Sequence, residues 1–296
     1  IPIHLLQGLV TAVILDFAIP LGDATKPDPL HKGFLTRCFT QHAALWFPAR
    51  SIFLPKIDKS KMYILAAWPH GLMGGANQYG FLDFEVQAGV HVVYTGASVL
   101  LYVPFLRRFL TSVGFVSVDR RGLQHVLKTN KFPYNVVHLL VGGIEEMFYT
   151  PMGAKDEQII LSKRKGFIKL ALQTGVDIIP SYTFGGNQVY YRLAGPDSWL
   201  CKLSRSLRVS LTPWLGLWNV PFSFFPRRVP VMTVVGQVMD IPRNVETTDE
   251  LVAKVHAEFE RKLCELFDTY KVVYVEQMGA DNAWLTKELK FENETM

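Results

Sequence analysis

Residues 68–71, Trp-Pro-His-Gly, are the first place in this sequence where residue types and spacing indicate chemistry. The imidazole of His70 titrates near neutral pH, so it suits a general base. Pro69 restricts the backbone before the ring and Gly71 frees the backbone after it, so a substrate could approach closely. A strand-like run precedes the motif, which would place His70 at the rim of an α/β sheet, where ligands usually bind. A lone histidine in a loop is more often structural, so this pattern alone leaves both readings open.

A second pattern, residues 141–146 (Val-Gly-Gly-Ile-Glu-Glu), ends another buried run with two glycines and two carboxylates. Paired glycines such as Gly142 and Gly143 let backbone N–H groups approach an anion or a developing oxyanion. A carboxylate at this point could orient an imidazole, as the third group of a triad does. A turn with solvated glutamates explains the same residues equally well.

A third block, residues 164–185, begins with a basic pair and continues as a helix that Gly175 would end. A strand follows and runs through Pro180. The N-terminal amides of the helix, together with Arg164 and Lys165, form a plausible phosphate site.

In this order, the three blocks resemble the histidine motif, the Gly-Gly-x-x-Glu motif and the long signature of the type-2 diacylglycerol acyltransferase family. The resemblance covers roughly residues 40–275, including residues 46–48 (Trp-Phe-Pro) and a segment at 102–120. The signature is specific, and it matches Arg164, Gly166, Phe167, Lys169, Ala171, Gly175, Pro180, Phe184 and Gly185.

The resemblance implies an enzyme that moves a fatty acyl group from acyl-CoA to a lipid hydroxyl, foremost that of diacylglycerol. His70 would be the general base on the acceptor hydroxyl. Glu146, chosen over Glu145 by the family motif, would orient it. Backbone amides near Gly71, or at Gly142 and Gly143, would stabilise the tetrahedral oxyanion.

Coenzyme A phosphates are expected at Arg164 and Lys165, with Arg120 a weaker candidate. No metal or bound cofactor is expected, and acyl-CoA acts as a co-substrate. The other expected partners are membrane lipids and the acceptor, while a homo-oligomer is left open. The expected place is the endoplasmic reticulum membrane, with the active site facing the cytosol, or lipid droplets.

Two departures from the family pattern bear on activity. Trp68 stands where the family usually has the first histidine of His-Pro-His-Gly. The resemblance maps catalysis onto the second histidine, which is present as His70. Related acyltransferases place an aspartate five residues after the histidine, and here that residue is Gly75. Three alternatives therefore stay open: a monoacylglycerol acceptor, a fatty-alcohol acceptor giving wax esters, and a lipid-binding member without activity.

Strand-like and helix-like runs alternate after residue 60, which predicts one α/β domain with a central, mainly parallel sheet flanked by helices. A capping-box pattern at residues 247–250 precedes the last helix. We expect strands at 62–68, 91–94, 115–118, 135–141, 177–184 and 231–235, and helices at 121–130, 165–174 and 248–270.

Composition favours a membrane-associated enzyme. Hydrophobic residues make up 49% of the chain and charged residues 19%, against about 25% charged in soluble proteins. The net charge of +5 suits an anionic lipid surface or a phosphorylated substrate. Basic residues are interleaved with aromatic ones and form no block, so nucleic acid is the weakest partner. Three scattered cysteines indicate a reducing compartment.

The expected division is a hydrophobic membrane-anchoring segment at 1–22, a linker at 23–40 and the acyltransferase domain at 41–296. Residues 1–15 carry no charge and Asp16 interrupts the run, so the first segment is a marginal membrane span or a buried core helix.

Residues 209–226 are also uncharged, but three prolines make a spanning helix doubtful. With Trp214, Trp218 and Phe222, this segment is expected at the membrane interface, on the acceptor side. A proline-rich loop folded onto the protein is the alternative.

Overall fold

The computed structural model describes residues 11–12, 14–16, 18, 48–72, 75–112, 114–129, 135–150, 153–195, 197–207, 211–223 and 225–292. The expected linker and most of the expected anchoring segment lie outside these residues. Among the described residues, no helix is both long enough and apolar enough to cross a bilayer. Asp16 is buried and pairs with Arg107 and Arg108, with its Oδ1 2.5 Å from Arg108 Nε. The membrane-anchoring role of residues 1–22 stays a prediction.

The described core is a seven-stranded sheet, and the expected mainly parallel arrangement is confirmed. Every neighbouring pair is parallel except β10 and β7, which are antiparallel. In spatial order the strands are β1 (Ala49–Phe53), β10 (Val231–Val235), β7 (Asp177–Phe184), β2 (Tyr63–Trp68), β5 (Val136–Leu140), β3 (Val92–Gly96) and β4 (Phe115–Ser117).

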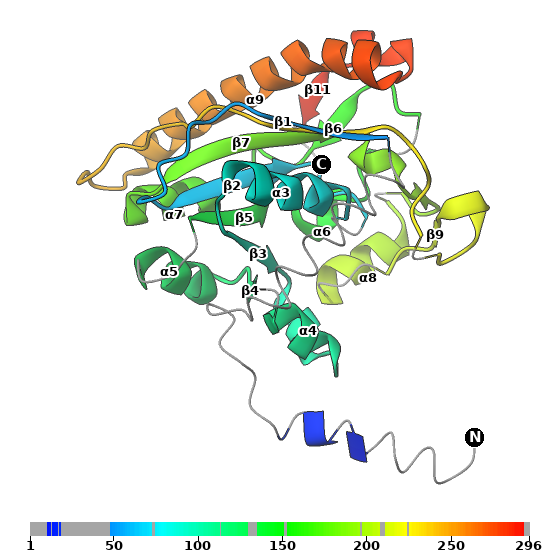
Figure 1. Cartoon of the computed structure of the whole chain (residues 1–296), viewed down its shortest axis with the longest axis horizontal. Helices are drawn as coiled ribbons and strands as arrows, with labels where there is room; N and C mark the ends of the chain where they lie inside the picture. The colour runs from blue at the N-terminus through cyan, green and yellow to red at the C-terminus, as the bar shows by residue number, and fades with distance from the viewer. Residues whose placement is uncertain are drawn as a thin grey trace.

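Helices cover both faces of this sheet, as Figure 1 shows. One face packs against α5 (Arg120–Thr129), α7 (Gly166–Thr174) and α9 (Asp249–Met278), while the other packs against α3 (Gly75–Ala88). Side chains of β2 alternate between the two cores, and all six of its residues are buried. A strand buried on both faces is a continuous apolar run, which is why β2 was visible in the sequence.

The last helix is longer than expected. Thr248 caps α9 by accepting a hydrogen bond from the Leu251 amide. The helix then passes the expected end at residue 270 and stops at Gly279, whose φ is +65°. The apolar face continues through Tyr274 and Val275, both buried, so packing extends the helix.

The remaining elements are short and lie mostly at the carboxyl edge of the sheet or beyond it. Two small sheets pair β6 (Glu157–Ile159) with β11 (Leu289–Phe291) and β8 (Tyr191–Arg192) with β9 (Trp214–Leu215). The helical pieces are η1 (Ser98–Tyr102), α4 (Leu106–Ser112), α6 (Gly143–Glu146), η2 (Gly186–Gln188), α8 (Trp199–Leu207), η3 (Leu217–Asn219) and η4 (Asn282–Thr286).

Candidate active site

His70 lies just past the carboxyl end of β2, as the sequence predicts. The chain turns there through Gly71, whose φ is +60°, a value that side-chain-bearing residues rarely adopt. A Cβ at Gly71 would lie 3.3 Å from the carbonyl oxygen of Gly186, which follows the neighbouring strand β7. Glycine therefore allows the turn to pack closely against the end of β7.

The imidazole is held by its own turn. Nδ1 of His70 lies 2.7 Å from the carbonyl oxygen of Gly71. A carbonyl only accepts hydrogen bonds, so Nδ1 carries the proton and donates it, and Nε2 keeps its lone pair. Burial lowers the pKa of His70, the bond to Gly71 acts in the opposite direction, and the positive charge of Arg164 lowers the pKa further. The ring is therefore neutral at physiological pH and suited to accept a proton at Nε2.

Glu146 is buried below the turn that carries His70, and its carboxyl group binds the main chain of that turn. Oε1 accepts from the His70 amide at 2.5 Å, and Oε2 accepts from the Ile160 amide at 2.8 Å. Glu146 was expected to orient the imidazole of His70. In the structure it binds the backbone amide of His70, while the carbonyl of Gly71 contacts the ring. Burial raises the pKa of Glu146 to about 8, and the two amide hydrogen bonds act against that rise.

Arg164 joins the Gly-Gly turn to the start of α7. Its Nη2 donates to the carbonyl oxygen of Gly142 at 3.1 Å and lies 3.6 Å from Glu145 Oε2. Gly143, with a φ of +69°, begins α6, which carries Glu146. The structure therefore brings parts of all three sequence blocks together at one edge of the sheet.

The other expected coenzyme A residues, Lys165 and Arg120, lie at the starts of two helices. Lys165 precedes α7 and is exposed, and among the described residues no side chain caps that helix. Lys169 pairs with Asp249 at the start of α9, at 2.8 Å. Arg120 donates to Gln173 of α7 at 3.2 Å, a bond that joins two helices and does not lead to His70.

Trp68 is a core residue in this fold. Its ring is fully buried, 6.0 Å from the ring of Phe167 and 5.5 Å from the ring of Phe259, and its Nε1 donates to the Ile160 carbonyl at 3.4 Å. The side chain that replaces the first motif histidine therefore points into the sheet–helix core.

Signature residues further along the chain also build the core. Pro180 lies within β7, and Phe184 at its end stacks on Phe267, with ring centroids 5.4 Å apart. Gly185 follows with a φ of +77°, and a Cβ there would lie 2.1 Å from the carbonyl oxygen of Pro230. These residues build the core on which the site rests.

The aromatic segment after α8 is a short hairpin with exposed side chains, and residues 208–210 and 224 lie outside the described part. Trp218 is 86% exposed and Phe222 is 56% exposed. Trp214 is half-buried, and its ring lies 5.1 Å from that of Phe222. Trp214 also packs against an apolar cluster that contains Leu72 and Phe148, near neighbours of His70 and Glu146 in the chain. The hairpin is thus linked to the site by apolar contacts.

His138 is a neighbour of the site that sequence reasoning missed. It lies in β5, paired with Leu65 of β2, and is buried. Burial and, to a lesser degree, the charge of His70 lower the pKa of His138 to about 3. Its only signal in the sequence is a histidine inside an otherwise apolar strand.

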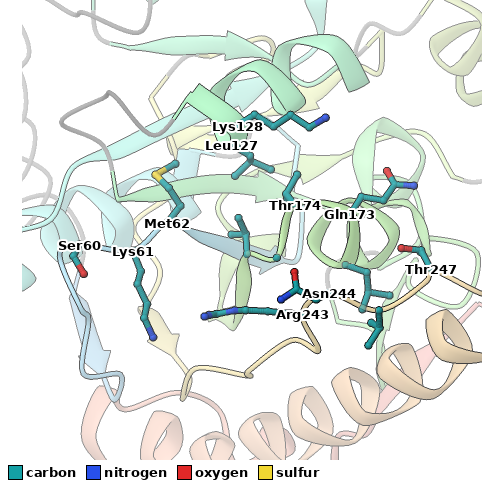
Figure 2. Close-up of a pocket in the computed structure, with 14 residues that line it drawn as sticks. Ser60, Lys61, Met62, Leu127, Lys128, Gln173, Thr174, Arg243, Asn244 and Thr247 are labelled. Carbon is teal, nitrogen blue, oxygen red and sulfur yellow. The ribbon is translucent and has the colours of Figure 1, made fainter.

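A hollow of about 920 Å³ lies at the opposite edge of the sheet (Figure 2). Its wall includes Lys61 and Met62, just before β2, and Val176, just before β7. His70 follows the other end of β2, so the six residues of the strand, at about 3.3 Å each, put roughly 20 Å between the two places. The hollow is therefore separate from the candidate active site.

A neutral histidine at a sheet edge, next to glycine-rich turns and an arginine, is an arrangement suited to group transfer on an α/β scaffold. The family model for diacylglycerol acyltransferases matches residues 10–280. Diacylglycerol O-acyltransferase 2 of Dictyostelium discoideum is 34% identical over 76% of this chain and 71% of its own length. Acyl-CoA wax alcohol acyltransferase 2 of Mus musculus is 30% identical over 79% and 73%. The human 2-acylglycerol O-acyltransferase 3 is 30% identical over 76% and 69%.

The chain belongs to the diacylglycerol acyltransferase family, and it is an O-acyltransferase. The predicted family is thereby confirmed. The roles of individual site residues stay predictions, as does the expectation that no cofactor is needed.

Proposed function

We propose that this chain transfers a fatty acyl group from acyl-CoA to the free hydroxyl of diacylglycerol, giving triacylglycerol. The observation that carries the mechanism is the hydrogen bond from His70 Nδ1 to the Gly71 carbonyl oxygen. It fixes the tautomer and leaves Nε2 as the basic nitrogen. The imidazole ring lies where residues of the three sequence blocks come together.

In the proposed step, Nε2 of His70 takes the proton of the acceptor hydroxyl while that oxygen attacks the thioester carbonyl carbon. The C–S bond then breaks, and the imidazolium returns the proton to the coenzyme A thiolate. Amides at Gly71, or at Gly142 and Gly143, stabilise the tetrahedral oxyanion. Base catalysis of this kind contributes ~10²–10⁴-fold to rate.

The coenzyme A phosphates are proposed to bind at the start of α7. Amides at a helix N-terminus attract anions, and no side chain in the described part of the chain caps this one. Arg164 and the exposed Lys165 add positive charge directly before the helix. In this proposal the polar part of acyl-CoA lies beside Arg164 and its reactive thioester lies near His70.

The acceptor is proposed to enter from the apolar side, at a membrane interface. Trp199, Leu203 and Leu207 of α8 are exposed, and so are Trp218 and Phe222 of the hairpin. Burying such side chains in lipid contributes roughly 1.5–3 kcal/mol each. The apolar cluster that joins Trp214 to Leu72 leads from this surface toward His70. The cytosolic face of the endoplasmic reticulum, or a lipid droplet, is the proposed place.

Monoacylglycerol and long-chain alcohols are the second candidates for the acceptor. Two relatives carry names for 2-acylglycerol and wax alcohol chemistry, at 30% identity each. All three acceptors present a hydroxyl on an apolar body, so the proposed base serves each of them equally well.

An acceptor panel tests the proposal. The purified protein in vesicles receives labelled acyl-CoA with diacylglycerol, monoacylglycerol or a fatty alcohol, and labelled product is measured. We expect triacylglycerol from the unmodified chain and a loss of at least ~10²-fold in His70→Ala. Normal transfer by a folded His70→Ala protein would refute the base, and no transfer to any acceptor would refute the function.

A further inference from the structure

The backbone just before Arg164 holds a carboxylate from the far end of the chain. Glu292 follows β11, and only 8% of it is exposed. Its Oε2 accepts from the Leu161 amide at 2.7 Å and the Ser162 amide at 3.3 Å, and its Oε1 accepts from the Lys163 amide at 2.9 Å. Successive amides that converge in this way make an anion-binding concavity, and here Glu292 fills it.

This amide concavity continues directly into the candidate active site. The preceding amide, that of Ile160, binds Glu146 Oε2. The following residue is Arg164, which binds the carbonyl oxygen of Gly142. Four consecutive amides, from 160 to 163, therefore hold two carboxylates, one below the His70 turn and one from the C-terminal segment.

The C-terminal segment is held firmly enough to act as a fixed support. Phe291 of β11 pairs with Ile159 of β6, and the Glu292 amide donates to the Ile159 carbonyl at 3.1 Å. Lys287 is buried with its Nζ 3.5 Å from Glu157 Oε1, and Trp284 lies in the main core. Glu292 thus reaches the amide concavity from an anchored segment.

We propose that Glu292 is a positioning residue of the acyl-transfer site. By holding residues 161–163 it fixes the amide that binds Glu146 and the backbone that carries Arg164. Its effect on catalysis rests on the proposed function, whereas its effect on the backbone does not. Because Glu292 occupies these amides, the coenzyme A phosphates are left to the N-terminus of α7 and Lys165.

The test compares Glu292→Gln with Glu288→Gln. Glu288 lies on the same segment, but its side chain is 71% exposed and lies 3.5 Å from Lys290, away from the concavity. Glutamine keeps the shape of Glu292 and turns an NH₂ group or a neutral oxygen toward three N–H donors. A hydrogen bond to a charged group contributes enough for its loss to change an equilibrium about tenfold or more.

Two measurements are made on the 296-residue chain in vesicles. We expect amide hydrogen exchange at residues 160–164 to accelerate about tenfold or more in Glu292→Gln, with exchange in β7 unchanged. We expect kcat/KM for acyl-CoA to fall by a similar, roughly tenfold factor, while the acceptor KM is unaltered. Glu292→Asp, which keeps the charge, should recover part of both effects, and Glu288→Gln should show neither.

Unchanged exchange at residues 160–164 in Glu292→Gln overturns the proposal, and so does a variant that melts earlier but keeps normal kinetics. A uniform rise in exchange over the whole chain also overturns it, because that result indicates general destabilisation. If the unmodified chain transfers no acyl group, the proposed function fails, and the exchange data alone then decide whether Glu292 holds the backbone.

Discussion

Replacing Gly142 with alanine adds one methyl group at the centre of the candidate site. The backbone of Gly142 has φ −59° and ψ −33°, an ordinary helical conformation that alanine adopts without strain. The added Cβ, however, would lie 2.0 Å from Glu146 Oε2 and 2.2 Å from its carboxyl carbon. The three atoms nearest to this added Cβ all belong to the carboxyl group of Glu146, so the substitution acts first on that group.

The size of the effect follows from the distances. Ordinary contacts of a Cβ begin at 3.4 Å, so a carboxyl oxygen at 2.0 Å must move by about 1.4 Å to restore normal packing. That shift disrupts the bonds to the His70 amide at 2.5 Å and the Ile160 amide at 2.8 Å. Each amide bond to this buried carboxyl group contributes about 0.5–1.5 kcal/mol, and a 1 Å misplacement at a site costs ~10²-fold in rate.

The assay measures kcat for acyl transfer in Gly142→Ala, Glu146→Ala and the double variant. We expect a loss of ~10²-fold in the first, and less than about a further twofold from Gly142→Ala once Glu146 is gone, because the two changes act through one contact. Gly195→Ala is the matched control, because no atom of the described residues lies within 4 Å of its added Cβ. A fully active Gly142→Ala enzyme, or losses that simply multiply in the double variant, would refute this reasoning.

Three further predictions follow from the same geometry. Arg164→Gln removes a positive charge that lowers the pKa of His70, so the pKa of His70 should rise. The acidic limb of the pH profile of kcat/KM should then move to higher pH, and a move to lower pH would contradict the role of this charge. Trp68→His truncates a fully buried ring and should lower the free energy of unfolding by about 3 kcal/mol in denaturant titrations; unaltered stability would contradict its core position. Combined Trp218→Ser and Phe222→Ser replacements should reduce vesicle flotation and leave acyl-CoA affinity unchanged, and undiminished flotation would count against the interfacial hairpin.

The strands were largely predictable because buried parallel strands are apolar runs. The ranges expected for β7 and β10 agree with the structure, and the other four expected strands differ by one or two residues at their ends. The edge strand β1 was missed because it is short and only partly buried. Helix α3 was missed because glycines weaken a helical pattern. A Cβ at Gly80 would lie 2.1 Å from Thr233 Oγ1, so close packing on β10 accounts for that glycine.

The grouping of site residues was predictable in part, because parallel strands deliver their following residues to one edge of the sheet. That rule brings His70 of the first block and Glu146 of the second together. The sequence could not predict which atoms of His70, Gly71 and Glu146 form hydrogen bonds, because that depends on the geometry of the turn. The turn directs the amide of His70 at Glu146 and the carbonyl of Gly71 at the ring. The contribution of Glu292 was also hidden, because it joins positions more than 120 residues apart.

The position of Trp68 bears on whether this family member is catalytic. Residue 68 is the last of β2, and its ring lies against α7 and α9 in the core, whereas the chain turns at Pro69 before it presents His70. A side chain in that core cannot reach a substrate that meets His70 at the sheet edge. The loss of histidine at position 68 therefore changes packing below the site and leaves the proposed base, its fixed tautomer and its supporting amides in place. Trp68 gives no physical ground for a protein that only binds lipid.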